Sequence, residues 1–288
     1  MSVLALADEA ATAALGQRLA RTAPHGAVVY LHGELGAGKS TLARAWLRAL
    51  GVDGTIRSPT YTLVERYPLG QDAEALHLDL YRIGDPGELE YLGLDESGAA
   101  LWLVEWPERG GDALPAADLH VRCFTRDASD RFWLGTAHGI WSVLADGTGL
   151  EGPLLLPSPL VGNEVRHLAV DARERLWVGT ARGLSHVDAR GTVTVVTTDE
   201  IHSLDGVTGR DLYFGTTSGL YRVGSLGDPE PLTEDVVTHL AFAADGSPWV
   251  ATREGAIRRF EAGTWQEVGT VASLGGGRLR DLTLSADG

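Results

Sequence analysis

The chain has 288 residues, with 24 lysine and arginine residues against 39 aspartate and glutamate residues and a net charge of −15. This length has room for two domains, and the charge argues against strong direct binding of nucleic acid or an anionic membrane. One cysteine, Cys123, excludes an intrachain disulfide, and no apolar run approaches the roughly 18 residues of a transmembrane helix. The first nine residues lack the features of a signal peptide. We therefore expect a cytoplasmic protein with no membrane contact.

Residues 1–123 alternate between helix-like and strand-like segments. Apolar residues recur at helical spacing in the helix-like segments, whereas the strand-like runs are short and rich in β-branched residues. This alternation predicts a three-layer α/β domain with a mostly parallel sheet. The expected elements are helices at residues 8–21 and 40–50 and strands at residues 27–31, 62–66, 75–79 and 101–105.

A glycine-rich segment joins the first expected strand to the second expected helix. Gly33–Ser40 has the spacing G-x-x-x-x-G-K-S of a phosphate-binding P-loop. Its Lys39 is the only lysine of the chain, since the other 23 basic residues are arginines. An ammonium is compact enough to lie over the β- and γ-phosphates, where a planar guanidinium is too wide. The order of strand, loop and helix is the context that this motif requires.

The backbone N–H groups of such a loop converge on phosphate oxygens. We expect Lys39 to contact the β- and γ-phosphates, the Ser40 hydroxyl to contact Mg²⁺, and Thr41 to lie near the α-phosphate. No Asn-Lys-x-Asp motif for guanine can exist without a second lysine, so ATP is favoured over GTP. The nucleotide-binding residues predicted in this segment are Gly36, Ala37, Gly38, Lys39, Ser40 and Thr41.

Two acidic residues follow apolar strands, where a carboxylate could stand beside the metal. They are Asp79 and Glu105, and on pattern alone each could equally be a solvated strand end. His77 is interpreted as a core or capping histidine rather than a ligand. Histidine and cysteine do not occur at the spacing of a zinc site.

The chain contains four motifs in this order: Gly33–Thr41, Ser58–Thr62, His77–Arg82 and Val104–Glu108. Together they resemble the TsaE (YjeE) family, the bacterial ATPase needed for tRNA threonylcarbamoyladenosine synthesis. The resemblance covers about residues 4–123 and implies binding of ATP and Mg²⁺ and slow hydrolysis. It also implies action in a complex with TsaD and TsaB, through which any connection to RNA would run.

The resemblance also implies roles for single residues. Ser40 and Glu105 match the metal-associated positions of the family, and Asp79 is a candidate for positioning the metal or the attacking water. The catalytic set is therefore Lys39, Asp79 and Glu105. No arginine finger is evident in the chain, so a partner is expected to accelerate hydrolysis.

The flanking motif residues have less direct roles. Thr60 and Tyr61 lie on a loop that is expected to sense the γ-phosphate, and Thr12 is expected to approach the adenine. Trp106 could contact the nucleotide or a partner, and a packed core tryptophan is an equal alternative.

Residues 124–288 have a different character, because they repeat. Positions Gly135, Gly179, Gly215 and Ala251 of the repeated segment are separated by 44, 36 and 36 residues. This period, with short alternating strands and Gly/Asp turns, predicts a β-propeller region of about four blades. The units resemble the propeller repeats of two-component regulators, and their recurring tryptophans are expected in the core. Those tryptophans are Trp133, Trp177 and Trp249.

The start and end of the array leave its architecture open. Residues 282–288 repeat the pattern of residues 240–246, so the last strand could pair with the first and close a ring of four units. A truncated or artificially joined array fits equally. The repeats begin where the TsaE-like domain should continue, so residues 1–123 are expected to lack their last strand. Arg126 lies near the place of a basic residue in that strand, without matching context.

Two other functions remain as alternatives. Residues 124–288 could serve as a sensor or scaffold for an unknown partner, with the P-loop domain as a passenger. A small-molecule P-loop kinase would need an acceptor pocket and a lid, and the sequence has no basic lid segment.

Overall fold

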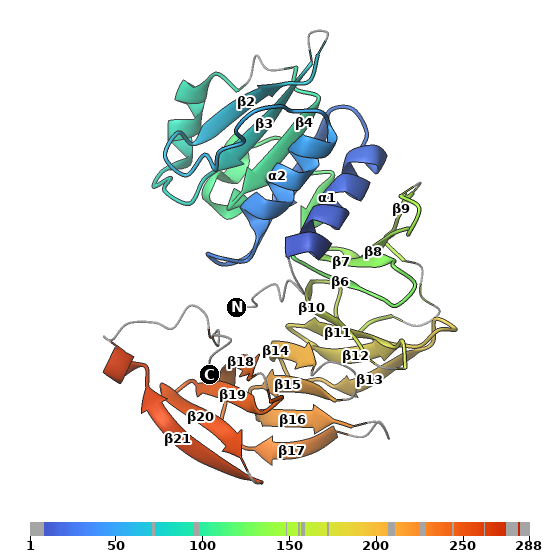
Figure 1. Cartoon of the computed structure of the whole chain (residues 1–288), viewed down its shortest axis with the longest axis vertical. Coiled ribbons are helices and arrows are strands. Elements are labelled where there is room, and N and C mark those ends of the chain that lie inside the picture. The colour runs from blue at the N-terminus through green and yellow to red at the C-terminus, as the bar shows by residue number, and fades with distance from the viewer. Residues whose placement is uncertain are drawn as a thin grey trace. The chain divides into compact units, whose positions relative to one another are not determined.

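The structure, a computed structural model, describes residues 9–274 except 71–72, 95–97, 148, 155, 157–158, 172, 207–210, 225–228, 244 and 262, together with residue 282. Its contacts form two compact units, one ending at Leu154 and the other beginning after it (Figure 1). None of the helices in the described part of the chain has the length and apolar character that crossing a membrane requires.

The first unit contains a five-stranded sheet whose order is β2-β3-β4-β1-β5. Strand β4 is parallel to both β1 and β3, β5 is parallel to β1, and only β2 is antiparallel to its neighbour. The prediction of a mostly parallel sheet is therefore confirmed. Its strands are β1 (Ala27–Leu31), β2 (Val64–Pro68), β3 (Glu74–Asp79), β4 (Leu101–Glu105) and β5 (Leu119–Val121).

Strand β2 begins two residues later than expected. Leu63 has a φ of 64°, which is a left-handed conformation that interrupts an extended strand. The expected strand at residues 62–66 is therefore displaced toward Pro68, whereas the other expected strands match closely.

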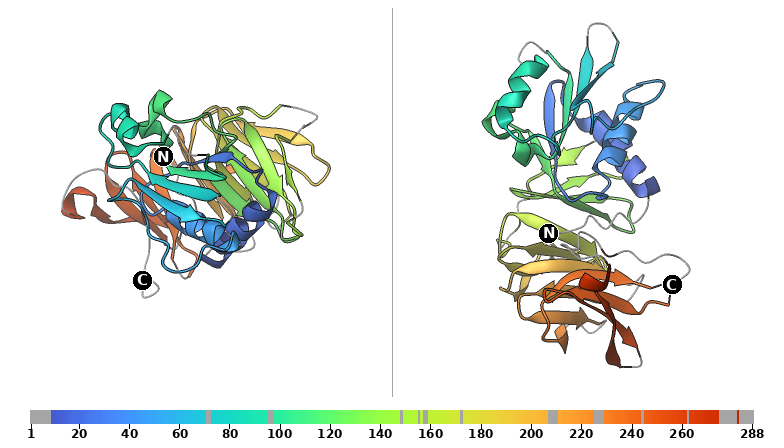
Figure 2. Two further views of the ribbon diagram at one scale, coloured as in Figure 1. Left: turned by 90° about the horizontal axis from the view of Figure 1, so that it is seen from above. Right: turned by 90° about the vertical axis from the view of Figure 1, so that its left-hand side faces the viewer.

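Two helices cover one face of this sheet, α1 (Glu9–Thr22) and α2 (Lys39–Ala49), as the right-hand view of Figure 2 shows. They pack closely because Gly16 of α1 has no side chain, and a Cβ there would lie 2.7 Å from Ala45 Cβ. Leu15, Leu19 and Trp46 are fully buried in this layer.

Short 3₁₀ helices lie over the opposite face: η1 (Pro86–Leu92), η2 (Pro107–Arg109) and η3 (Gly111–Ala113). Leu89 of η1 packs with Leu78 and Val104 of the sheet in one apolar cluster. Since side chains alternate between the faces of a strand, His77, Asp79 and Glu105 belong to the face opposite Leu78 and Val104, which is the face of α2. This gives the expected three layers.

The first unit also includes a four-stranded antiparallel sheet, in the order β6-β7-β8-β9. Arg18 of α1 donates to the backbone carbonyl and carboxylate of Asp130, and its guanidinium lies 4.9 Å from the Phe132 ring centroid. The domain boundary predicted at 123/124 lies at the start of β6, whereas the compact unit continues to Leu154. The boundary stays a prediction, and so does the absence of the last strand of the TsaE-like domain. The strands are β6 (Cys123–Arg126), β7 (Phe132–Thr136), β8 (Gly139–Val143) and β9 (Leu150–Glu151).

The described part of the second unit contains three further four-stranded antiparallel sheets. Together with the sheet of β6 to β9 they make four, so the predicted all-β repeat region with about four propeller-like blades is confirmed. The first sheet is β10 (Val165–Val170), β11 (Leu176–Thr180), β12 (Gly183–Val187) and β13 (Val193–Thr197). The second is β14 (Ile201–Gly206), β15 (Leu212–Thr216), β16 (Gly219–Val223) and β17 (Pro229–Thr233). The third is β18 (Val237–Phe242), β19 (Pro248–Thr252), β20 (Ala256–Glu261) and β21 (Thr264–Thr270), followed by η4 (Ala272–Leu274).

The repeated Gly-Thr has a structural role in the hairpin between the second and third strands. Thr180 Oγ1 donates to the Gly183 carbonyl at 3.1 Å, and Thr216 Oγ1 donates to the Gly219 carbonyl at 3.3 Å. Gly183 has a φ of 140°, and a Cβ there would lie 2.1 Å from the Thr197 carbonyl oxygen. The glycine that begins the third strand, Gly183 in this sheet, is therefore required because another backbone segment lies too close for a side chain.

The prediction that all three recurring tryptophans lie in the core holds only for Trp177, which is fully buried. Trp133 and Trp249 are half-buried. An arginine lies over each of the three rings, so that contact does not separate them: 5.3 Å for Arg131, 5.2 Å for Arg175 and 5.8 Å for Arg259. Trp177 differs because it also packs in an apolar cluster with Ile201 and Leu204 of the next sheet. The predicted pairing of residues 282–288 with the first repeat lies outside the described residues apart from Leu282.

Candidate nucleotide-binding site

The P-loop connects β1 to α2 and bends through three glycines. Gly33, Gly36 and Gly38 have φ values of 133°, 84° and 82°. These conformations are strained for residues with a side chain. Helix α2 begins at Lys39, directly after Gly38. The loop therefore presents the N-terminus of an 11-residue helix, the arrangement that binds phosphate groups.

Lys39 is 7% exposed and its ammonium is enclosed by the loop. Nζ donates to the carbonyl oxygens of Gly33 and Glu34, each at 2.8 Å, and lies 4.3 Å from the centroid of the Trp106 ring. Burial lowers the pKa of Lys39, and the nearby negative charges of Glu105 and Asp79 oppose that shift. The two loop carbonyls thus hold the Lys39 cation at the P-loop.

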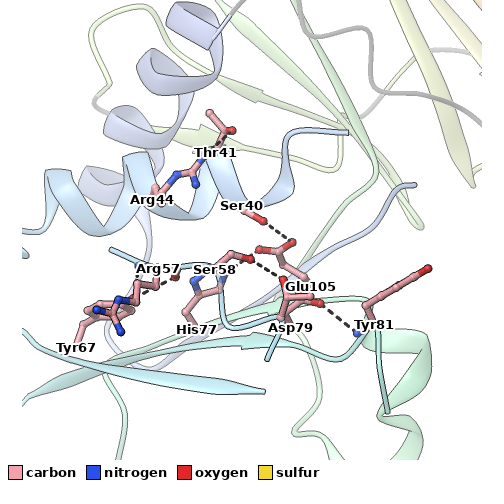
Figure 3. Close-up of polar contacts among 11 residues, drawn as sticks. Ser40, Thr41, Arg44, Arg57, Ser58, Tyr67, His77, Asp79, Tyr81 and Glu105 are labelled. Carbon is pink, nitrogen blue, oxygen red and sulfur yellow. Dashed lines mark hydrogen bonds and ion pairs between the residues drawn. The ribbon is translucent and has the colours of Figure 1, made fainter. Parts of the chain in front are cut away.

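Ser40 and Glu105 meet at the carboxyl end of the sheet (Figure 3). Ser40 Oγ donates to Glu105 Oε2 at 3.0 Å. The other carboxylate oxygen, Oε1, lies 2.8 Å from Nε2 of His77. Glu105 is 2% exposed, so it is not a solvated strand end. A hydroxyl beside a buried carboxylate provides the oxygen ligands that Mg²⁺ prefers.

Asp79 lies beside Glu105, because the two residues are register partners in β3 and β4. Thr60 Oγ1 donates to Asp79 Oδ2 at 2.6 Å, and the backbone N–H of Tyr81 donates to Oδ1 at 3.1 Å. Ser58 Oγ lies 2.9 Å from Thr60 Oγ1, as part of the same network. Asp79 is 4% exposed, so this carboxylate is also buried and held in place.

Other predicted residues lie around this centre. Trp106 has a φ of 58° and packs on Tyr81 with 5.0 Å between ring centroids. Thr41 Oγ1 accepts a hydrogen bond from Arg44 at 3.2 Å on the partly exposed side of α2. Thr12 is fully buried in α1, and its approach to adenine stays a prediction.

The loop predicted to sense the γ-phosphate has one half-buried and one exposed residue, Thr60 and Tyr61. Thr60 is held by Asp79, whereas Tyr61 is 83% exposed and its ring lies 4.4 Å from the guanidinium carbon of Arg82. The sensing role of this loop stays a prediction.

A histidine pair next to the P-loop was not found from the sequence. His32 Nε2 lies 3.1 Å from His120 Nδ1, and the rings are stacked with centroids 5.4 Å apart. His32 Nδ1 also lies 3.7 Å from Glu108. Burial lowers the pKa of His120, and the neighbouring His32 and His138 lower it further. The pair depends on β1 lying beside β5, which no local pattern indicates.

The residues present fit a nucleotide with its magnesium ion. The glycine loop and Lys39 can receive phosphates, and the oxygen atoms of Ser40 and Glu105 suit a hard cation. The fold and this arrangement define a P-loop nucleotide-binding protein of the α/β class. The family model described as "Threonylcarbamoyl adenosine biosynthesis protein TsaE" matches residues 6–132.

Comparison with known proteins identifies the family. The tRNA threonylcarbamoyladenosine biosynthesis protein TsaE of Streptomyces coelicolor is 38% identical over 138 residues, which is 47% of this chain and 89% of the relative. The protein of that name from Haemophilus influenzae is 47% identical over 96 residues, 33% of this chain and 60% of the relative. This chain belongs to the TsaE family. The chain spans 60% of the length of the Haemophilus influenzae protein, which is less than two thirds.

Among solved structures, the extracellular domain of the putative one component system BT4673 from B. thetaiotaomicron is similar to this chain at 18% identity and a TM-score of 0.47. The match covers 59% of this chain and 24% of that one.

Proposed function

We propose that this chain is an ATP-binding, Mg²⁺-dependent ATPase that takes part in forming threonylcarbamoyladenosine in tRNA. The observation that carries the proposal is the hydrogen bond between Ser40 of the P-loop and the buried Glu105 of β4. It joins a phosphate-binding loop to a metal-type carboxylate, which is the pairing that P-loop ATPases need. Membership of the TsaE family supports the connection to tRNA modification.

The side chains have separate roles in this proposal. The P-loop amides and Lys39 hold the phosphates, and Ser40 and Glu105 would hold Mg²⁺, which supplies neutralisation of the developing charge. Asp79 is fixed by Thr60 and by the Tyr81 N–H, so its carboxylate can hold a water molecule in one orientation. Hydrolysis is slow without a partner, because no arginine finger is evident in the sequence.

The partners in this proposal are TsaD- and TsaB-like proteins, and the location is the cytoplasm. The net charge of −15 supports contact with tRNA through those partners rather than directly. The alternative role of residues 124–288 as a sensor or scaffold stays a prediction.

Calorimetric titration with the ATP analogue AMP-PNP and MgCl₂ tests the proposal. The variant Lys39→Ala should weaken binding about 10- to 100-fold, because a charge-assisted contact to phosphate is lost. The control Arg190→Ala, in an exposed turn of the second unit, should bind as the wild-type chain does. Equal affinity of Lys39→Ala and wild type would contradict the proposal.

The connection to tRNA needs a separate experiment. The assay contains purified TsaD and TsaB, tRNA, threonine, bicarbonate and ATP, together with the enzyme that condenses the last three into the activated threonylcarbamoyl donor. It should yield modified tRNA over repeated turnovers only when the wild-type chain is added. The Lys39→Ala chain should not replace it. Mass spectrometry of the digested tRNA measures the product, and equal yields without the chain would exclude this role.

A further inference from the structure

His77 makes a contact that its sequence context did not predict. Its Nε2 lies 2.8 Å from Oε1 of Glu105, while Ser40 Oγ donates to Oε2 of the same carboxylate at 3.0 Å. Each carboxylate oxygen therefore has a different partner. Two contacts on opposite oxygens fix both the position and the rotation of the carboxylate plane.

The sheet fixes His77 relative to Glu105. Residue 77 is the register partner of Leu103 in β4, and Asp79 is the partner of Glu105. His77 is fully buried, with 0% exposure. A carboxylate at this depth needs hydrogen-bond donors, since water cannot supply them freely. His77 is the donor that comes from the sheet, and Ser40 is the donor that comes from the P-loop.

The two ring nitrogens of His77 have different surroundings. Nε2 faces Glu105, whereas Nδ1 is buried with no hydrogen-bond partner among the described residues. A proton on Nε2 satisfies the carboxylate, while a proton on Nδ1 would have no acceptor. The geometry therefore selects the tautomer that carries its proton on Nε2.

We propose that His77 is a positioning residue that holds Glu105 through Oε1, so that Oε2 is presented to Ser40 at the place where a nucleotide-bound Mg²⁺ would be held. His77 itself does not touch the nucleotide. The proposal rests on the proposed function, because it assigns His77 a role in that same site. Residues that orient the ligands of a metal commonly change its affinity about 10- to 100-fold when they are removed.

The matched variants are His77→Gln and His77→Met. The two side chains have similar length and volume, but only glutamine has an N–H group at the position of Nε2. Calorimetry with AMP-PNP is performed on the full chain, first in EDTA and then at increasing MgCl₂. The two quantities measured are the affinity without Mg²⁺ and the Mg²⁺ concentration that gives half of its full effect on binding.

We expect both variants to keep the wild-type affinity in EDTA within about 2-fold, because His77 does not contact the phosphates. His77→Met should raise the half-saturating Mg²⁺ concentration about 10-fold, and His77→Gln should stay within about 3-fold of wild type. An unchanged value in His77→Met would overturn the proposal. So would equal losses in both variants, which would indicate packing alone.

The same titrations separate this proposal from the proposed function. If wild type binds AMP-PNP with Mg²⁺ and only the His77 prediction fails, the ATPase proposal stands. If wild type shows no Mg²⁺-dependent binding, both are overturned.

A second measurement uses the wild-type chain and does not depend on a folded His77→Met variant. Two-bond ¹H–¹⁵N correlation spectra of the histidine rings distinguish the two tautomers. The spectrum of His77→Gln identifies the His77 signal among the nine histidines by its disappearance. A proton on Nε2 is expected, and a ring that carries its proton on Nδ1 alone would overturn the proposed hydrogen bond.

Discussion

The ammonium of Lys39 lies 4.3 Å from the centroid of the Trp106 ring, within the range of a cation–π contact. Trp106 follows β4 with a φ of 58°, a conformation that costs a non-glycine residue roughly 1–2 kcal/mol. With the Trp106 backbone in this left-handed conformation, the indole ring contacts both Lys39 and Tyr81. Trp106 is therefore coupled to the phosphate site without being part of the P-loop.

Trp106 should report nucleotide binding by fluorescence. A phosphate that binds Lys39 draws the ammonium toward itself and weakens the contact with the indole ring. We expect AMP-PNP with Mg²⁺ to change the tryptophan emission, and Trp106→Phe to remove most of that change. Trp265→Phe, in β21 of the second unit, is the control and should keep the response. A full response in Trp106→Phe would exclude this coupling.

Thr60 should matter for hydrolysis more than for binding. Its hydroxyl donates to Asp79 at 2.6 Å, and valine has the same shape without a donor. We expect Thr60→Val to lower the rate of ATP hydrolysis about 10-fold, in keeping with the loss of an orienting group. The affinity for AMP-PNP should be unchanged. Thr60→Ser retains the hydroxyl and should hydrolyse ATP at nearly the wild-type rate, so a loss equal to that of valine would contradict the role.

Gly16 should resist replacement by alanine although it lies inside a helix. Alanine normally favours a helix over glycine by about 1 kcal/mol. At this position the new Cβ would lie 2.7 Å from Ala45 Cβ and 2.9 Å from the Trp46 backbone nitrogen. We expect Gly16→Ala to lower the free energy of unfolding by about 1–3 kcal/mol through overpacking.

Urea denaturation measures the effect of Gly16→Ala, with the exposed neighbour Gln17→Ala as the matched control. The control should match or slightly exceed wild-type stability, because alanine is favourable at an exposed helical position. A stabilised Gly16→Ala chain would show that α1 and α2 do not approach as closely as the structure has them.

His167 in β10 should make the second unit sensitive to acid. Burial lowers the pKa of His167 from 6.5 to about 3. Between these values the unfolded chain binds a proton that the folded chain does not, so stability is fully present above pH 6.5 and falls as the pH drops. The free energy of unfolding falls by at most about 1.4 kcal/mol for each pH unit below pH 6.5.

The variant His167→Gln has no side chain that binds a proton in this pH range, so its stability is the reference for the wild-type chain. The stability of wild type relative to the variant, measured by calorimetric melting, should fall steadily from pH 6.5 to pH 4. At pH 8 neither side chain is charged, so the difference there gives the packing effect alone. A difference that does not vary with pH would contradict the shifted pKa.

The sequence by itself determined the features that depend on local spacing. The spacing of the glycines and Lys39 predicts the P-loop, because the strand, the three left-handed glycines and the helix that form it are adjacent in the chain. The repeat region was predicted for the same reason, since each repeat contains the strands and turns of one sheet. Recurrence at one repeat position does not show how fully each copy is covered, so Trp133 and Trp249, which are half-buried, were wrongly placed in the core with the fully buried Trp177.

Only the tertiary structure decided how the site is assembled. Sequence left Asp79 and Glu105 between a metal site and a solvated strand end, and the parallel pairing of β3 with β4 buries both beside the P-loop. The same pairing places His77 on Glu105. These contacts join segments that are distant in the chain, and their positions are set by strand order and by the packing of α2, which local residue patterns do not encode.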